Sequence, residues 1–128
     1  MSSYVLDASA LMALFHQEPG SDKVEQAIED GAAISTVNLS EVASKLNELG
    51  TPEKLIQTVI NVLELNIVDF NTELAYKAGL LRPLTKRAGL SLGDRACLAL
   101  AQNLNLPALT ADRAWETLSL GIKVQVIR

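Results

Sequence analysis

The sequence has few of the residues that form cross-links or soft metal sites. Among its 128 residues there is one cysteine, Cys97, and one histidine, His16. A single cysteine excludes an intrachain disulfide and fits a reducing compartment. Without a set of Cys and His ligands, any metal has to be bound by oxygen atoms. We expect Cys97 to belong to the core and His16 to lie at the surface end of a helix.

Long apolar runs and a basic leader are also absent. The first residues, Met-Ser-Ser-Tyr-Val-Leu-Asp, lead us to expect neither a signal peptide nor a membrane span, and a cytoplasmic location. The net charge of −4 argues against broad electrostatic binding of nucleic acid, but it leaves room for a local basic groove. The length fits one domain, residues 1–128. The apolar fraction of 48% predicts an apolar surface that is buried against a partner.

Apolar runs typical of buried strands alternate with helix-like stretches, and no hairpin signal appears. This pattern predicts a single α/β domain with a parallel sheet. The expected strands cover residues 3–7, 32–37, 67–70, 107–110 and 122–127. The expected helices cover 8–17, a stretch capped by Ser21, one capped by Asn38, one opened by Thr51-Pro52-Glu53, one capped by Asn71, an apolar helix capped by Ser91, and 113–118 with a packed Trp115.

Four acidic residues stand at or near the points where apolar runs stop: Asp7, Glu41, Asp94 and Asp112. In a parallel sheet with helical crossovers, strand ends and helix starts lie along one edge, where such folds place their sites. Converging carboxylates repel one another unless a hard divalent cation shares their oxygens. Each acid also fits a structural role. Asp7 and Asp112 suit N-caps, whereas Glu41 and Asp94 follow Asn38 and Ser91 at capping-box spacing.

Several segments of the chain resemble PIN-domain proteins, and the VapC-type toxin ribonucleases in particular. They are residues 5–11 (VLDASAL), 18–20 (EPG), 40–42 (SEV), 90–96 (LSLGDRA) and 109–115 (LTADRAW). The resemblance implies a PIN-like domain with a five-stranded parallel sheet in the order 3-2-1-4-5. It also implies a Mg²⁺- or Mn²⁺-dependent endoribonuclease with the catalytic acids Asp7, Glu41, Asp94 and Asp112. Such toxins commonly form homodimers and are inhibited by a small VapB-type antitoxin. Gly93 stands where the family often has Ala.

The chemistry of the side chains suggests separate roles within this site. Because Mg²⁺ keeps several waters and takes one or two carboxylates directly, we assign Asp7 and Asp94 as direct ligands. Glu41 and Asp112 then act through water or on a second metal. The hydroxyls of Ser9 and Thr110 either orient water or phosphate, or bond to local backbone. Arg95 and Arg113 each follow an acid, so they can balance charge or contact phosphate.

Two other functions fit parts of the pattern. One is a catalytically silent PIN-like module that only binds its partner. The other is a phospho-receiver domain, which needs an acidic pair after the first strand and an Asp after the third. Here the first strand ends in a single acid, and Asp69 is expected inside the third strand. Both features favour the ribonuclease over the receiver.

Overall fold

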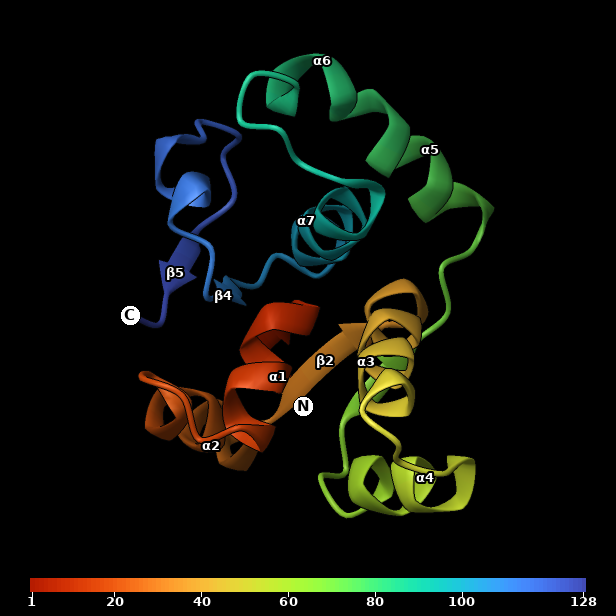
Figure 1. Ribbon diagram of the computed structural model, residues 1–128. Coiled ribbons are helices and arrows are strands. Elements are labelled where there is room, and N and C mark those ends of the chain that lie inside the picture. The colour runs from red at the N-terminus through yellow and green to blue at the C-terminus, as the bar shows by residue number, and fades with distance from the viewer.

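Strands and helices alternate along the chain, as the sequence predicts. A computed structural model describes all 128 residues (Figure 1). The strands are β1 (Tyr4–Leu6), β2 (Ala32–Ser35), β3 (Asn66–Val68), β4 (Ala108–Thr110) and β5 (Val124–Val126). The helices are α1 (Ala8–Phe15), α2 (Ser21–Asp30), α3 (Thr36–Glu48), α4 (Glu53–Asn61), α5 (Thr72–Leu80), α6 (Arg82–Thr85), α7 (Leu92–Leu104) and the 3-10 helix η1 (Arg113–Thr117).

The five strands form one sheet in the order β3-β2-β1-β4-β5, and every neighbouring pair is parallel. The predicted fold class and strand order are therefore confirmed. Since β1 lies between β2 and β4, the chain reverses its direction of winding at the centre of the sheet. The carboxyl ends of β1 and β4 are neighbours there, at the place where open α/β sheets hold their sites.

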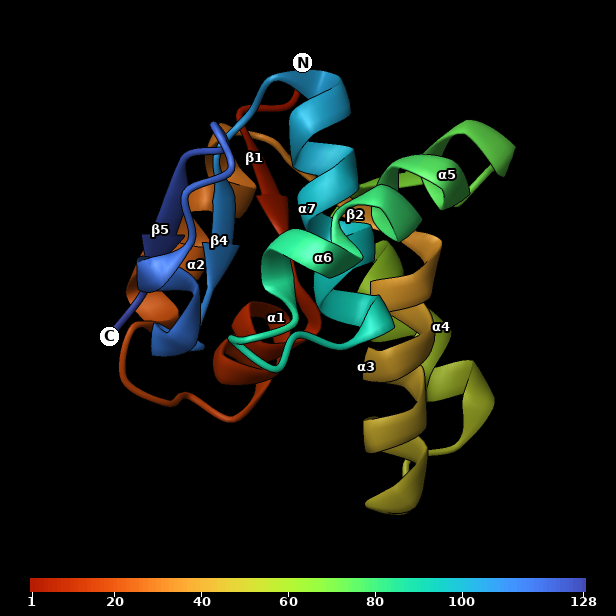
Figure 2. The same ribbon diagram turned by 90° about the horizontal axis from the view of Figure 1, so that it is seen from above.

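Side chains alternate between two cores, one on each face of the sheet. On one face of the sheet, β1, β2 and β4 contribute Leu6, Ile34 and Leu109 to the first core. On the other face they contribute Val5, Ala33 and Ala108 to the second. Helices α1 to α4 contribute to the first core, and α5 and α7 to the second. Figures 1 and 2 show α7 across the sheet from α1 and α2. The period of two along each strand thus buries both faces.

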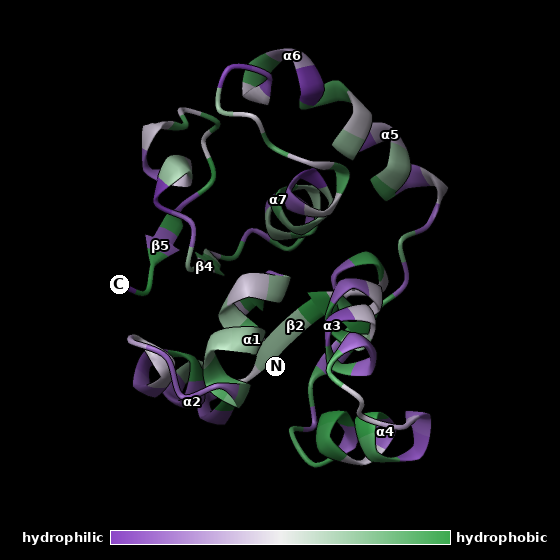
Figure 3. Ribbon diagram, in the orientation of Figure 1, coloured by the Kyte–Doolittle hydropathy of each residue, from purple (hydrophilic) through white to green (hydrophobic).

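Helix α7 is the most deeply buried helix, as its apolar sequence predicts. Each residue from 96 to 101 has at most 1% of its surface exposed, and Cys97 lies among them. Helix α2 instead is mostly hydrophilic on its outer side, whereas β2 is hydrophobic (Figure 3). No helix in the structure combines the length and the apolar character needed to cross a bilayer.

The structure corrects three local predictions. Strand β2 ends at Ser35, which caps α3 by accepting from the Val37 N–H at 3.2 Å, so Asn38 is not a cap. Gly20, with a φ of 94°, precedes α2 in place of a Ser21 cap. Asp69 follows β3 and does not lie inside it. Its side chain is exposed beside an edge strand, so it lacks the buried strand-end setting expected of a receiver.

Candidate functional site

Asp7 lies at the centre of the sheet edge, between β1 and α1. Its carboxylate caps α1 by accepting from the Ala10 N–H at 2.8 Å. It also accepts from the Thr110 hydroxyl at 2.6 Å and from the Ser9 hydroxyl at 2.8 and 2.9 Å. The predicted N-cap is therefore present. The same carboxylate joins the end of β1 to the end of β4.

The two hydroxyls beside Asp7 also bond to backbone. Ser9 Oγ accepts from the Ala111 N–H, and Thr110 Oγ1 accepts from the Asp112 N–H, both at 3.0 Å. Each hydroxyl therefore holds the link between β4 and η1 while directing its own proton to Asp7. The predicted bonding to backbone is therefore present at both hydroxyls. The orientation of water or phosphate stays a prediction.

The Asp7 carboxyl group is almost completely buried, with 3% of the residue exposed. Burial raises its pKa from 3.8 to about 6, against the opposing effect of the hydrogen bonds from Thr110, Ala10 and Ser9. The charge of Asp94 raises this pKa further. The only ion pairs in the structure are Lys77–Glu73 and Arg128–Glu18. The buried Asp7 charge therefore has no cationic partner among the side chains.

Asp94 and Asp112 occupy the helix starts that the sequence predicts for them. Asp94 and Ser91 form a reciprocal capping box: the Ser91 N–H donates to Asp94 Oδ2 at 2.9 Å, and the Asp94 N–H donates to Ser91 Oγ at 3.2 Å. Asp112 is exposed and caps η1 by accepting from the Ala114 N–H at 2.9 Å. Capping leaves carboxylate lone pairs free at both positions.

Glu41 has a different setting from the capping box expected of it. It lies in the second turn of α3, and its Oε1 accepts from the Asn38 Nδ2 at 2.8 Å. The same amide nitrogen donates to the Gly93 carbonyl at 3.0 Å. The side chain of Asn38 thus joins α3 to the start of α7. Sequence reasoning missed this contact because Asn38 and Gly93 are 55 residues apart.

The negative charges of three of the four acids raise the pKa of one buried thiol in α7. The pKa of the Cys97 thiol is raised well above 9.0, first by burial and then by the negative charges of Asp7, Asp94 and Glu41. Asp112 is not among these causes. The carboxylates nevertheless do not form a cluster of three or more close enough to hold one ion.

This donor set fits a hard divalent cation in its chemistry. It consists of carboxylate and hydroxyl oxygens, and its central carboxylate is buried without a counter-charge. Mg²⁺ usually keeps several waters and binds one or two carboxylates, so a closed cage of three is not required. Asp7 supplies one such group at the sheet edge, and the charge of Asp94, in the first turn of α7, acts on it.

Other residues singled out in the sequence lie in different settings. The Arg95 Nη1 donates to the Ala78 carbonyl of α5 at 3.1 Å, and its Nε is buried without a partner. The Arg113 Nε donates to the Arg128 carbonyl at 3.1 Å. Neither guanidinium forms an ion pair with the four acids. Trp115 is buried, which confirms that it packs in the core.

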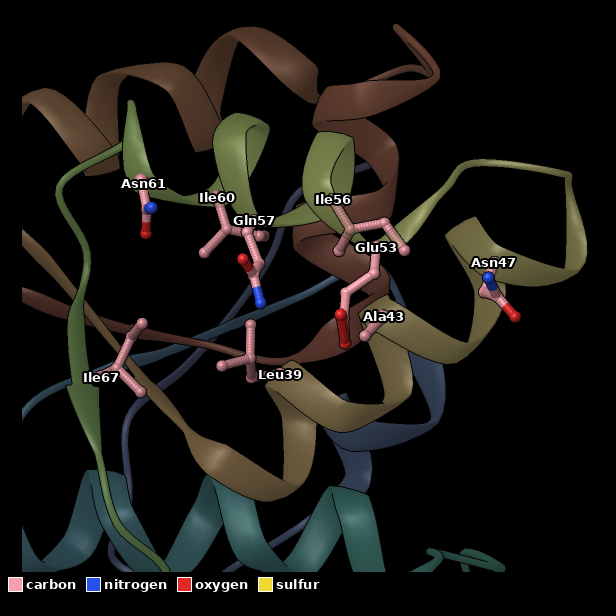
Figure 4. A pocket seen from close by; sticks show the side chains of 9 residues that line it. All are labelled: Leu39, Ala43, Asn47, Glu53, Ile56, Gln57, Ile60, Asn61 and Ile67. Atoms are coloured by element: carbon pink, nitrogen blue, oxygen red, sulfur yellow. The ribbon is translucent and has the colours of Figure 1, made fainter.

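The largest hollow of the structure lies away from the four acids. It is a groove of about 490 Å³ between α3, α4 and β3, and Figure 4 shows its side chains. Leu39, Ala43, Ile56, Ile60 and Ile67 form its apolar lining. Glu53 is its only acidic residue. Asn47, Gln57 and Asn61 complete the lining, and none of the four acids belongs to it.

Known structures resemble this one over nearly the whole chain. The chain in a DNA-bound VapBC from Salmonella typhimurium is 20% identical, with full coverage of both chains and a TM-score of 0.77. A chain from a toxin-antitoxin complex of Klebsiella pneumoniae is 24% identical, with 98% of each chain covered and a TM-score of 0.73. VapC20 of Mycobacterium tuberculosis, a Sarcin-Ricin loop cleaving toxin, is 13% identical, with 94% of this chain and 99% of that chain covered and a TM-score of 0.72.

Sequence comparison leads to the same fold family. No curated protein matches the chain in sequence. The profile of the PIN domain matches residues 4–119, a span that includes Asp7, Glu41, Asp94 and Asp112. The matched span begins at the first residue of β1 and ends seven residues short of Val126, the last residue of β5. Because this match covers most of the chain and agrees with the fold, the protein belongs to the PIN domain family.

Proposed function

We propose that this protein is a metal-dependent endoribonuclease that hydrolyses RNA phosphodiesters as the toxin of a toxin-antitoxin pair. The observation that carries the proposal is the buried Asp7 carboxylate at the edge of the sheet, which has hydrogen bonds from Ser9 and Thr110 but no cationic partner. A site with so much uncompensated negative charge suits a divalent cation. Family membership supports a nuclease, and one structural neighbour is described as a Sarcin-Ricin loop cleaving toxin.

Each residue has a defined task in this proposal. Asp7 and Asp94 would hold a Mg²⁺ or Mn²⁺ ion directly, and Glu41 and Asp112 would act through bound water or on a second ion. The cation, when bound, supplies an activated water and relieves negative charge on the phosphate. The hydroxyls of Ser9 and Thr110 fix the Asp7 carboxylate in one orientation. Burial of Asp7 limits the water that competes for its oxygens.

Removal of the metal provides the direct test. Purified protein free of inhibitor should cleave single-stranded RNA in Mg²⁺ or Mn²⁺. Excess EDTA should stop the reaction, because it removes the cation and the chain has no set of Cys and His ligands for another metal. Added Mn²⁺ should restore cleavage. The measurement is gel analysis of an end-labelled RNA over time. Undiminished cleavage in excess chelator would contradict the proposal.

The second candidate is a PIN-like module that binds a partner without cleaving RNA. The observation that favours it is the absence of a preformed cluster of three carboxylates. In that case Mn²⁺ should neither raise the melting temperature nor activate cleavage. A protein that is stabilised by Mn²⁺ and cleaves RNA excludes this alternative.

We also propose a small VapB-type antitoxin as the inhibitor and the cytoplasm as the place of action. Several structural neighbours come from VapBC complexes. An inhibitor that offers an Arg side chain to the acidic edge would supply the cation that the four acids lack.

Besides RNA and an antitoxin, we predict a second copy of this chain as a partner, in a homodimer. Three apolar side chains follow one another at helical spacing on α5 and α6: Tyr76, Leu80 and Leu84, with 71%, 75% and 65% of their surface exposed. We expect light scattering to give a mass of twice 13.8 kDa. Leu80→Lys should shift the protein to the monomer, because a charge in an apolar contact is costly. Leu49→Lys, at an exposed site at the end of α3, is the control. A native monomer at micromolar concentration would exclude the dimer.

A further inference from the structure

The amide of Asn38 holds the carboxylate of Glu41 in place. Asn38 is 1% exposed, and its Nδ2 donates both to Glu41 Oε1 and to the Gly93 carbonyl. Both partners are acceptors only, so the orientation of the amide is fixed: a flipped amide would set its oxygen against two oxygens. Asn38 thus joins α3 to α7, which lie side by side in Figures 1 and 2, and it also orients the Glu41 carboxylate within α3.

Gly93 provides the space that this carboxylate occupies. A Cβ atom added at Gly93 would lie 2.5 Å from Glu41 Oε1 and 2.6 Å from its Cδ, and it would also contact Oε2. Gly93 is buried in the first turn of α7, where helical backbone suits any residue. Its lack of a side chain is therefore not required by its backbone angles. Instead it leaves room for the end of the Glu41 side chain, which an added Cβ would displace.

We propose that Asn38 and Gly93 are positioning residues, which together hold the Glu41 carboxylate against the start of α7, beside Asp94. The inference rests on the proposed function, because it gives Glu41 a role at the metal site. Asn38 supplies the hydrogen bond that orients the carboxylate, and Gly93 supplies the room. Partners that orient a metal-site carboxylate typically change metal affinity or activity by about 10–100-fold when they are removed.

The second polar atom of Asn38 separates a positioning role from a structural one. Its Oδ1 is buried and has no hydrogen-bond partner. An apolar side chain of similar size, as in Asn38→Leu, removes this unpaired group, and the Gly93 carbonyl keeps its helical bond within α7. If Asn38 has only a structural role, Asn38→Leu should lower the stability of the protein. If Asn38 positions Glu41, Asn38→Leu should lower activity while stability stays equal or rises.

A double-mutant cycle with Glu41→Ala tests the inference by two readouts. Asn38→Leu should lower the RNA cleavage rate by about 10–100-fold and weaken Mn²⁺ binding in calorimetry when Glu41 is present. In the Glu41→Ala background the same change should alter both quantities less than about twofold, since no carboxylate remains to be positioned. The melting temperature of Asn38→Leu in EDTA should equal or exceed that of the native protein. Equal losses in both backgrounds would overturn the proposal.

Gly93→Ala gives a second, independent test should Asn38→Leu fail to fold. The new methyl group should displace Glu41 and reduce cleavage and Mn²⁺ binding, and both losses should disappear in the Glu41→Ala background. Gly79→Ala in α5 is the matched control, because a Cβ there meets nothing within 4 Å. It should leave both readouts unchanged. A Gly93→Ala protein with native Mn²⁺ binding and cleavage would refute the role of Gly93.

The outcomes distinguish this inference from the proposed function. If the native protein neither binds Mn²⁺ nor cleaves RNA, the proposed function fails and the positioning role fails with it. If the native protein does both while Asn38→Leu and Gly93→Ala match it, the positioning role fails alone.

Discussion

Replacement of Asp7 by Asn should reduce metal-dependent RNA cleavage by more than about 100-fold while the fold is retained. Partners behind a metal ligand typically contribute about 10–100-fold, so loss of the ligand's own charge should have a larger effect. Asn keeps the size of the side chain, and its oxygen can still accept from the Ala10 N–H that Asp7 caps. The rate of cleavage of a labelled RNA at saturating Mn²⁺ measures the effect.

Two further variants give this experiment its controls. Asp69→Asn removes the same charge from an exposed residue at the end of β3 and should cleave at the native rate. Asp94→Asn keeps a side-chain acceptor for the Ser91 N–H, so a large loss of cleavage there would come from the missing charge and not from the cap. An Asp7→Asn protein that keeps more than a tenth of the native rate would rule out Asp7 as a ligand.

The same Asp7→Asn substitution should stabilise the metal-free protein at neutral pH. Asp7 has a pKa of about 6 in the folded state against 3.8 for the ordinary group. The folded state therefore binds this proton more tightly than the unfolded chain does. The free energy of unfolding falls as the pH rises from about 4 to about 6, and it remains at the lower level above that range. At about 1.36 kcal/mol per pH unit, the full loss is about 3 kcal/mol. Asn cannot ionise, so the variant avoids this loss.

Unfolding in EDTA at two pH values tests this prediction. The stability advantage of Asp7→Asn should be small at pH 4, where Asp7 is protonated in the folded protein, and approach about 3 kcal/mol at pH 7.5. Added Mn²⁺ should stabilise the native protein by mass action, about 2.7 kcal/mol at a hundredfold excess over its Kd, and stabilise the variant less. Asp69→Asn again serves as the control. An advantage that does not grow between the two pH values would show that the buried charge does not limit stability.

Such a trade between stability and activity is common at functional sites. By the prediction above, Asp7 is an ionisable group in a place where a neutral side chain would be more stable. Asn38 is also a polar residue whose burial costs stability, since its buried Oδ1 has no hydrogen-bond partner. The two residues lie on different elements, Asp7 before α1 and Asn38 in α3, and both belong to the acidic edge.

The sequence by itself determined the order of the elements and the place of the acids along the chain. Strand and helix periods, and caps such as Asn71 and Ser91, depend on residues within a few positions of one another. For this reason the parallel sheet, its helical crossovers and the capping roles of Asp7, Asp94 and Asp112 were predictable. The errors were local ones, such as the Ser35 cap of α3, where two polar residues compete for the same helix start.

Only the tertiary structure decided which of these residues interact and in what surroundings. Asp7 accepts a hydrogen bond from Thr110, 103 residues away, and the setting of Glu41 depends on Gly93 in another helix. Arg95, which follows an acid in the sequence, contacts the Ala78 carbonyl of α5 instead. The physical reason is that desolvation, packing space and charge compensation come from neighbours distant in sequence, which a periodic pattern of single residues does not encode.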